Sequence, residues 1–190
     1  MILIYRGLTI LLYPLILILL YLRKIINKED PLRYKEKIFP SFFKKKKKES
    51  ANLIWFHAAS IGEFKSVLPI IENLKVQANT EFLVTTVTYS SGKLAEEKLK
   101  KFKNIHHRYF PVDITFVLEK FIKLWGPKAV FLVESEIWPN LIFTLKKFKI
   151  PLILINARIT RKSYKRWKKV PSFSDKIFNS FDLNLASSLE

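Results

Sequence analysis

Six short strand candidates, most of them apolar, alternate with amphipathic stretches between residues 52 and 190, and this alternation limits the fold more than any other feature of the chain. The strand candidates occupy residues 53–56, 82–86, 106–109, 129–133, 152–155 and 183–186. Helical periodicity occupies residues 64–76, 92–101, 114–124, 138–148 and 160–169, with a short stretch at 174–179. This order predicts an α/β, Rossmann-like domain, with a mostly parallel sheet, right-handed crossovers and helices on both faces. Runs that are apolar almost throughout are typical of strands covered on both sides.

Polar residues punctuate these elements. We expect Ser90 or Ser91 to cap the second helix, Asp113 the third and Thr160 the fifth. The sequence contains no Walker loop and no Gly-x-Gly-x-x-Gly, so it gives no support for a dinucleotide site. The chain stops soon after the sixth apolar run without a closing helix, which we interpret as the end of one half of a larger protein.

The turn after the first apolar run carries the strongest local signal. It reads His57-Ala58-Ala59-Ser60-Ile61-Gly62-Glu63. Gly62 is expected to give the backbone freedom in the turn. Glu63 falls at a helix N-terminus, at the carboxyl end of a strand, which is the edge where open α/β sheets bind ligands. A carboxylate there is either a partner of the helix dipole or a catalytic group.

Other polar side chains follow the remaining strands. Glu134 and Glu136 follow the fourth strand and Arg158 follows the fifth. Neighbouring carboxylates drive one another's pKa values apart, which suits acid/base chemistry, and we expect Glu134 to raise the pKa of Glu63 in this way. Helix N-termini and Arg158 offer sites for anions. We therefore expect Glu63 and the Glu134/Glu136 pair to meet at one edge of the sheet.

Each of these residues also has a structural interpretation. Either glutamate of the pair could cap the following helix, and two carboxylates alone are weak evidence for a metal. We expect His57 to be a packed, hydrogen-bonded core residue. His106-His107 has no carboxylate or cysteine at ligand spacing, so no metal site is expected there. Arg158 could instead bridge to a helix C-terminus.

Residues 1–22 contain one charged side chain, Arg6, and are apolar all round. A spanning helix needs about 20 apolar residues, so the length suffices if Arg6 snorkels to an interface. Pro14 is expected to kink the helix. No small-residue cleavage site follows, which argues against a removed signal peptide. We interpret residues 1–22 as a membrane anchor helix, and the sequence leaves open whether it spans the bilayer or lies on it.

Basic residues follow the anchor at once, from Arg23 to a lysine run at 44–48. The positive-inside rule places this side in the cytoplasm, and such a collar attracts anionic lipid head groups. A nuclear-localisation or RNA-binding role fits less well beside a membrane anchor, so we expect no nucleic-acid partner. Residues 23–51 are expected to be a basic juxtamembrane segment and linker, and residues 52–190 the folded domain.

The charge balance agrees with this picture but does not require it. The net charge is +18, from 34 basic and 16 acidic residues. A basic surface attracts nucleic acid, anionic lipid or a phosphorylated substrate, although heavy use of Lys and Ile also fits a lysine-favouring genome. The absence of cysteine excludes disulfides, thiolate metal sites and a cysteine nucleophile.

Taken in order, these features resemble the N-terminal half of the 3-deoxy-D-manno-octulosonic acid (Kdo) transferases of lipopolysaccharide synthesis. The anchor is followed by Arg33-Tyr34-Lys35-Glu36-Lys37, the turn from His57 to Glu63, Val84-Thr85-Thr86-Val87-Thr88, Tyr109-Phe110-Pro111-Val112-Asp113, Glu134-Ser135-Glu136-Ile137-Trp138-Pro139-Asn140-Leu141-Ile142 and Asn156-Ala157-Arg158-Ile159. Any one motif is weak, but together and in this order they are a strong signal over essentially the whole chain.

The resemblance implies two Rossmann-like domains in the arrangement called GT-B, at the cytoplasmic side of the bacterial inner membrane. Such enzymes transfer Kdo from CMP-Kdo to a lipid A precursor, lipid IVA, with no bound metal or cofactor. It implies that Glu63 is the general base and that Glu134 stabilises the transition state. Acceptor binding is expected to involve Ser60, Gly62, Thr86 and Arg158.

The family's nucleotide-sugar domain binds CMP-Kdo, and we expect that domain to be absent from this chain. The polypeptide alone is therefore expected to be inactive. Two other functions stay open. One is a different membrane-associated GT-B transferase with another lipid acceptor, and the other is a non-catalytic, truncated membrane-bound module.

Overall fold

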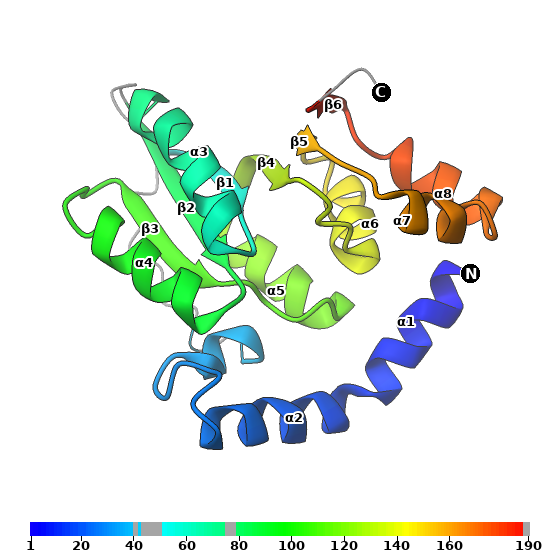
Figure 1. Cartoon of the computed structure of the whole chain (residues 1–190), viewed down its shortest axis with the longest axis horizontal. Helices are drawn as coiled ribbons and strands as arrows, with labels where there is room; N and C mark the ends of the chain where they lie inside the picture. Colours follow the sequence, from blue (N-terminus) through cyan, green and yellow to red (C-terminus); the bar gives the residue numbers. More distant parts are fainter. Residues whose placement is uncertain (40–41, 43–50, 75–78, 188–190) are drawn as a thin grey trace.

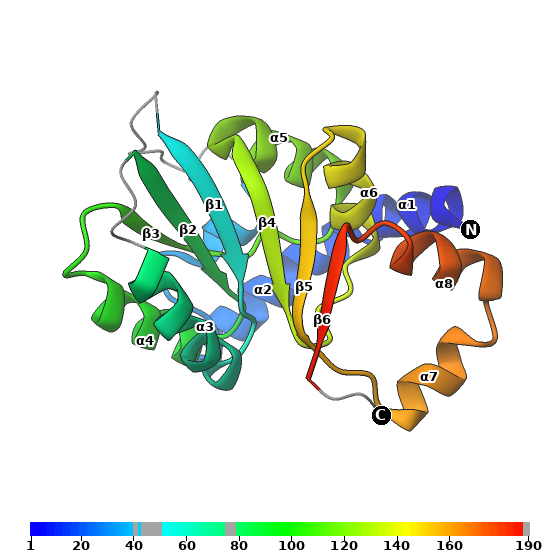
Figure 2. The same ribbon diagram turned by 90° about the horizontal axis from the view of Figure 1, so that it is seen from above.

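The computed structural model describes residues 1–39, 42, 51–74 and 79–187. Its centre is a six-stranded sheet in the order β3-β2-β1-β4-β5-β6, and every neighbouring pair is parallel (Figures 1 and 2). The strands are β1 (Asn52–His57), β2 (Thr80–Thr86), β3 (Ile105–Tyr109), β4 (Pro127–Val133), β5 (Leu152–Ala157) and β6 (Leu183–Ala186). The predicted parallel α/β, Rossmann-like fold is confirmed.

Helices cover both faces of this sheet (Figure 2). Helices α3 (Ile61–Leu74) and α4 (Tyr89–Leu99) lie on one face, and α5 (Thr115–Trp125) and α6 (Pro139–Lys147) lie on the other. Helices α7 (Arg161–Trp167) and α8 (Pro171–Phe178) connect β5 to β6. Each of these helices falls on a stretch whose periodicity predicts it, with ends shifted by up to three residues.

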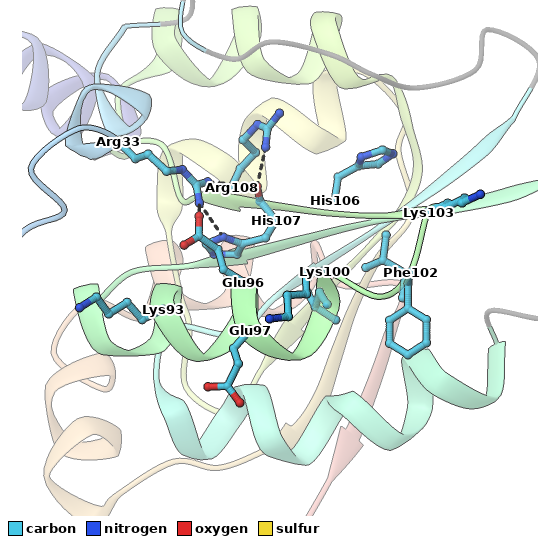
Figure 3. A pocket seen from close by; sticks show the side chains of 12 residues that line it. Arg33, Lys93, Glu96, Glu97, Lys100, Phe102, Lys103, His106, His107 and Arg108 are labelled. Carbon is cyan, nitrogen blue, oxygen red and sulfur yellow. Dashed lines mark hydrogen bonds and ion pairs between the residues drawn. The ribbon is translucent and has the colours of Figure 1, made fainter.

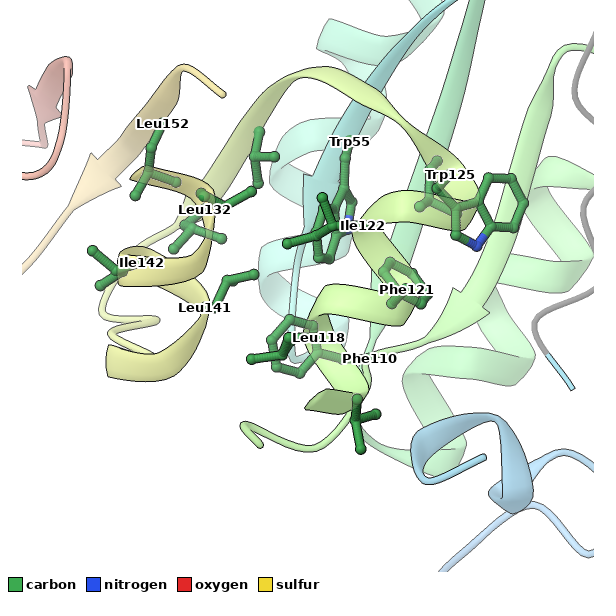
Figure 4. Packing of buried hydrophobic residues seen from close by; sticks show 14 of the residues in the cluster. Trp55, Phe110, Leu118, Phe121, Ile122, Trp125, Leu132, Leu141, Ile142 and Leu152 are labelled. Carbon is green, nitrogen blue, oxygen red and sulfur yellow. The ribbon is translucent and has the colours of Figure 1, made fainter. Parts of the chain in front are cut away.

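The strand β1 shows how the two cores form. Leu53 and Trp55 belong to the cluster under α5 and α6, whereas Phe56 belongs to the cluster under α3 and α4. Figure 4 shows Trp55 within the first cluster. Successive side chains of a strand face opposite sides of the sheet. A strand buried on both sides must therefore be apolar at every position, and these three side chains are fully buried.

The helix caps differ in part from the expected ones. Thr160 accepts a hydrogen bond from the Ser163 amide at the start of α7, which confirms that prediction. Helix α4 begins earlier than expected, because Thr88 is its N-cap and Ser91 completes a capping box. Asp113 does not cap α5, since its carboxylate accepts the first amides of α6 instead.

The N-terminal segment forms two helices rather than the one expected over residues 1–22. Helices α1 (Ile2–Leu11) and α2 (Tyr13–Ile25) meet at a bend of 54°, which agrees with the kink expected at Pro14. In the described part of the chain, no single helix is long and apolar enough to cross a membrane, but this bent pair passes that test together.

The bent pair lies along the edge of the domain (Figure 1). The Tyr5 hydroxyl donates to Asp113 Oδ2 at 2.9 Å, and the Asn140 side-chain amide donates to Thr9 Oγ1 at 3.1 Å. The Tyr13 ring meets the Phe116 ring edge-on. Because these partners follow β3 and begin α5 and α6, the helix pair contacts the domain near the carboxyl ends of the strands.

The expected linker over residues 23–51 requires a correction. A 3₁₀ helix, η1 (Tyr34–Lys37), packs against the sheet, and four charged residues around it are buried: Glu29, Asp30, Glu36 and Lys37. Charges leave water only when they are paired, and these side chains find partners on β3, on Arg23 and Arg33, and on one another. The folded unit therefore includes residues well before Asn52. The lysine run at 44–48 lies outside the described residues.

Candidate functional site

Glu63 lies in the first turn of α3, at the edge where the strands end. Its backbone amide donates to Ser60 Oγ at 3.2 Å, and its Oε2 accepts the Ala59 amide at 2.9 Å. The Ser60 side chain also hydrogen-bonds the Glu63 carboxyl group. The turn therefore holds the carboxylate in place through Ala59 and Ser60.

The pKa of Glu63 is raised above the ordinary value for a glutamate. Burial of the carboxyl is the main cause, and the nearby charge of Glu136 adds to it. Hydrogen bonds from Ser60 and Ala59 act in the opposite direction without cancelling the rise. A carboxylate with a raised pKa is a stronger base at neutral pH than an exposed one. The structure thus corrects our expectation that Glu134 is the carboxylate that raises the pKa of Glu63.

Glu136 is held by a hydrogen-bonded chain that crosses the end of the sheet. Trp55 Nε1 donates to Thr85 Oγ1 at 2.8 Å, which lies 3.0 Å from His57 Nδ1. His57 Nε2 lies 3.3 Å from Glu136 Oε2, which also accepts from Trp138 Nε1 at 2.7 Å. Nδ1 also lies 3.3 Å from the Thr85 carbonyl oxygen, so both ring nitrogens of His57 have partners within the protein.

This chain gives Glu136 an environment unlike that of Glu63. Burial raises the pKa of Glu136, but the bonds from His57 and Trp138 outweigh it, and the pKa is lowered overall. His57 is fully buried and stacks on Phe110 with ring centroids 3.9 Å apart. The prediction of a packed, hydrogen-bonded histidine is confirmed. The two neighbouring carboxylates therefore have pKa values shifted in opposite directions, which is the pattern that separates acid and base roles.

Glu134 lies on the other side of the same loop and faces a cavity. The backbone φ is 60° at Glu134 and 53° at Asn156, so both residues adopt the left-handed helical conformation. Asn156 Nδ2 lies 3.4 Å from Glu134 Oε1. A non-glycine residue in this conformation costs about 1–3 kcal/mol, and such strain is concentrated at functional sites. Glu134 directly follows β4, and Asn156 is the second-last residue of β5.

The cavity has a volume of about 690 Å³ and combines polar and apolar walls. Glu134 and Arg158 supply its charges. Its apolar lining comes from Ile137, Ile159, Trp167 and Phe178 among others. Arg158 is exposed, and its guanidinium forms no ion pair with a described residue, so the alternative bridge to a helix end is not observed. The cavity offers a positive charge for an anion beside apolar surface.

The remaining predicted site residues have different fates. Ser60 is half-buried and supports Glu63. Gly62 is exposed within α3, does not have a positive φ, and leaves open space where a Cβ would stand, apart from Ser60 Oγ at 3.8 Å. The turn therefore does not need the conformational freedom of glycine at position 62, and the missing side chain leaves the surface open there. Thr86 is fully buried and its hydroxyl bonds to His107 Nε2 at 2.9 Å. Because β2 is covered on both faces, we withdraw Thr86 from the acceptor-binding set.

A second hollow of about 880 Å³ lies beside β3 and α4 (Figure 3). Arg33 lines it, but its guanidinium is engaged by Glu36, by Glu96 and by His107. Lys93, Lys100 and Lys103 also line this hollow, so it is basic as well, but none of the predicted site residues lines it. In the described ranges, no group of three or more acidic or histidine side chains is arranged to hold a metal ion.

Comparison with known proteins shows the family of this chain. Residues 33–190 match the family described as 3-deoxy-D-manno-octulosonic-acid transferase (kdotransferase). The chain belongs to the Kdo transferase family. It is 35% identical to the Kdo transferase of Rickettsia bellii over 93% of this chain and 41% of the relative. Identity to the Kdo transferase of Haemophilus influenzae is 30%, over 68% of this chain and 30% of that protein.

The chain spans less than half of the length of these Kdo transferases. Among solved structures, a SeMet-substituted CurJ carbon methyltransferase superimposes on 72% of this chain and 35% of its own, with a TM-score of 0.38 and 16% identity. That likeness is too low to support an argument about function. The family assignment therefore depends on the sequence match alone, and the site geometry is a separate observation.

Replacing Glu136 with Gln should lower the pKa of Glu63, because it removes a neighbouring negative charge while His57 and Trp138 keep a hydrogen-bonding partner. Carboxyl ¹³C NMR titration measures this, with the Glu63 signal assigned from Glu63→Gln. Glu134→Gln is the matched control and should leave the Glu63 midpoint in place. Equal shifts in the two variants, or none in either, would show that Glu136 does not act on Glu63.

Proposed function

We propose that this chain is the acceptor-binding half of a Kdo transferase that moves Kdo from CMP-Kdo to the glucosamine disaccharide of lipid IVA, in lipopolysaccharide core biosynthesis. The observation that carries the proposal is Glu63, a buried carboxylate with a raised pKa that its own turn holds at the ligand edge of the sheet. Family membership supports Kdo as the transferred sugar and CMP-Kdo as the donor in this proposal. We assign CMP-Kdo binding to the part of the relatives that this chain does not match.

Glu63 would act as the general base. As the acceptor hydroxyl attacks the anomeric carbon of Kdo, the bond from that carbon to the CMP phosphate breaks and the hydroxyl loses its proton. Oε1 of Glu63 accepts that proton, while Oε2 stays bonded to the Ala59 amide. The raised pKa strengthens the base, and the turn holds it in position before substrate arrives.

The other two glutamates would have separate roles. Glu134 lies at the cavity, so it is the candidate to stabilise positive charge that develops on the donor sugar. Glu136 is bonded to His57 and Trp138, and it would act through the pKa of Glu63 rather than on substrate. This division keeps the proposed catalytic pair, Glu63 and Glu134, and adds Glu136 as its electrostatic partner.

The cavity beside Glu134 suits a phosphorylated glycolipid. Arg158 offers a planar guanidinium for a phosphate group, and Trp167 and Phe178 offer apolar surface. Ser60 and Gly62 lie on the open side of the Glu63 turn, where an acceptor hydroxyl would approach. The proposal includes no nucleic-acid partner, metal or cofactor.

Arg158→Ala should weaken binding of a soluble phosphorylated glucosamine disaccharide by about tenfold or more, since a charge-assisted hydrogen bond contributes about 1.5–3 kcal/mol. Isothermal calorimetry on the 190-residue chain measures this. Arg161→Ala is the matched control, because Arg161 begins α7 but does not line the cavity. Tight binding of CMP to this chain, or equal affinity of the two variants for the disaccharide, would contradict the acceptor-domain assignment.

Glu63→Gln should keep folding and acceptor binding but lower turnover by roughly 10²-fold or more, the usual contribution of a positioned base. Turnover is measured with the chain joined to the nucleotide-sugar half of a relative. Glu72→Gln, a partly exposed glutamate on the same helix, is the control and should keep the parental rate. Turnover within a few-fold of the parent would leave Glu63 as a helix-capping residue only.

The bent helix pair supports a membrane location on the cytoplasmic side of the inner membrane. Its domain-facing stripe includes Tyr5, Thr9, Tyr13 and Leu20. The opposite side exposes large apolar residues: Leu3, Ile4, Leu8, Leu11, Leu15, Ile18, Leu19 and Leu22. Arg23, Lys24 and Lys28 follow directly. We propose that the pair lies in the membrane surface, with its apolar side among the lipids and its basic end at anionic head groups.

Leu15→Asp combined with Leu19→Asp should lower binding to vesicles containing anionic phosphatidylglycerol by at least about tenfold, since each buried leucine contributes roughly 1.5–3 kcal/mol. Flotation of the protein with vesicles measures this at low and high salt. Ile70→Asp with Leu183→Asp, two exposed apolar residues elsewhere, is the control. Release of the parent by high salt alone would instead assign binding to the basic residues.

A further inference from the structure

The motif from Arg33 to Lys37 belongs to the matched family region, yet none of its side chains lines the cavity around Arg158. We propose that Lys37 is a positioning residue for Glu63, acting through the backbone of the two loops that follow β1 and β2. The proposal rests on the proposed role of Glu63 as the base, and its first test does not use turnover.

Lys37 is buried, with 5% of its surface exposed, and its charge is balanced inside the protein. Its ammonium group pairs with Glu29, which is 2% exposed and also accepts from Arg23 Nε at 2.7 Å. The ammonium group also lies over the Tyr109 ring, 5.3 Å from its centroid. A buried lysine is retained only where specific partners replace its water.

One of those partners leads to the candidate site. Lys37 Nζ donates to the Val87 carbonyl oxygen at 2.7 Å. Val87 follows the last residue of β2, where regular pairing with the neighbouring strands ends, and its own amide donates to the Ala59 carbonyl oxygen at 3.2 Å. The Ala59 amide in turn donates to Glu63 Oε2 at 2.9 Å. Three hydrogen bonds thus connect the buried ammonium group to the proposed base.

The rest of the motif holds Lys37 in place. Glu36 Oε2 accepts the Tyr109 amide at 3.1 Å, so a side chain takes a hydrogen bond from the edge strand β3. Arg33 bonds to the same carboxylate group and to Glu96 of α4, as Figure 3 shows for Glu96. The Lys37 carbonyl accepts the Val112 amide at 2.8 Å. Segment, edge strand and loop are therefore joined around one buried ammonium group.

The physical consequence concerns the precision of the Glu63 carboxylate. Few backbone bonds hold the loop beyond β1: Ala58 donates to Thr85, and the Ala59 carbonyl accepts from Val87 and from Ser91 Oγ. A misplacement of about 1 Å at a reacting group costs about 10²-fold in rate. An apolar residue at position 37 would fill the space but leave the Val87 carbonyl without its donor. A lysine side chain is long enough to reach both partners. Its positive charge balances the Glu29 carboxylate, and its N–H groups donate to the Val87 carbonyl oxygen.

The test compares Glu29→Gln/Lys37→Met with Glu29→Gln alone in the full 190-residue chain. Glu29→Gln removes the buried negative charge, so Lys37→Met does not leave that charge without a partner. The amide oxygen introduced at position 29 can still accept from Arg23. Lys37→Arg retains the charge and a donor, and Lys35→Met alters a partly exposed lysine of the same 3₁₀ helix. Circular dichroism and thermal melting establish that each variant is folded.

Two measurements report on the turn itself. In the folded double variant, hydrogen exchange of the Ala59 amide should accelerate roughly tenfold, on the scale of one lost hydrogen bond. The pKa of Glu63 should rise further, because the Ala59 bond that favours its charged form is weakened. Glu29→Gln, Lys37→Arg and Lys35→Met should keep parental values for both. Selective ¹⁵N-alanine and ¹³C-carboxyl labelling make both signals accessible by NMR.

Parental exchange and titration in the folded double variant would overturn the proposal. If the double variant does not fold, Glu29→Gln/Lys37→Gln decides, because the shorter glutamine side chain cannot replace the Lys37 donor to the Val87 carbonyl. Faster Ala59 exchange in that variant than in Glu29→Gln supports the connection, and equal exchange contradicts it. Turnover then separates this inference from the proposed function. With Glu63 as the base, the double variant should lose kcat with little change in KM and Lys37→Arg should restore it. Parental turnover in Glu63→Gln would refute the base without altering the NMR result.

Discussion

Backbone polar groups at the ends of parallel strands are the constraint on which much of this structure depends. The hydrogen bonds between strands stop near the end of each strand. The backbone N–H and C=O groups just beyond that point are still partly buried and need other hydrogen-bonding partners. Side chains from distant segments supply them. Lys37 donates to the Val87 carbonyl, Asp113 accepts from the start of α6, and Glu63 accepts from Ala59. The carboxyl edge is therefore a region of interlocked loops, and a base attached to it is held at both ends of its turn.

The N-terminal helices contribute to the same edge. Tyr5 and Thr9 bond to Asp113 and Asn140, which in turn bond to each other across the loops that open α5 and α6. The helix pair is thus joined to the domain through polar contacts, and its exposed apolar side faces away from them. For a lipid-linked acceptor this geometry has a simple advantage, because the surface proposed to contact lipid and the proposed catalytic edge belong to one folded unit.

The three carboxylates at the site differ because their surroundings differ, not their chemistry. Burial and the charge of Glu136 raise the pKa of Glu63, whereas hydrogen bonds from His57 and Trp138 lower that of Glu136. Glu134 turns away through a left-handed backbone and reaches the cavity with Arg158. A motif with two glutamates two residues apart thereby supplies one group to the base and another to the cavity, since the bend at Glu134 sends the two side chains in different directions.

Periodicity and residue type determined the strands and helices of the α/β domain from sequence alone, although not the 3₁₀ helix η1 or the division of the N-terminal segment into two helices. Leu53, Trp55 and Phe56 are apolar because β1 is covered on both faces, and a strand of that kind is recognisable from its residue types. The turn that carries Glu63 was visible for the same reason, as a polar break directly after such a strand. The sequence did not reveal which glutamate faces Glu63, that Thr86 is enclosed, or that Lys37 is buried. Those outcomes depend on contacts between residues far apart in the chain: His57 with Glu136, Thr86 with His107, and Lys37 with Val87. Local patterns record what a segment needs to bury, whereas only the assembled sheet decides which distant side chain satisfies it.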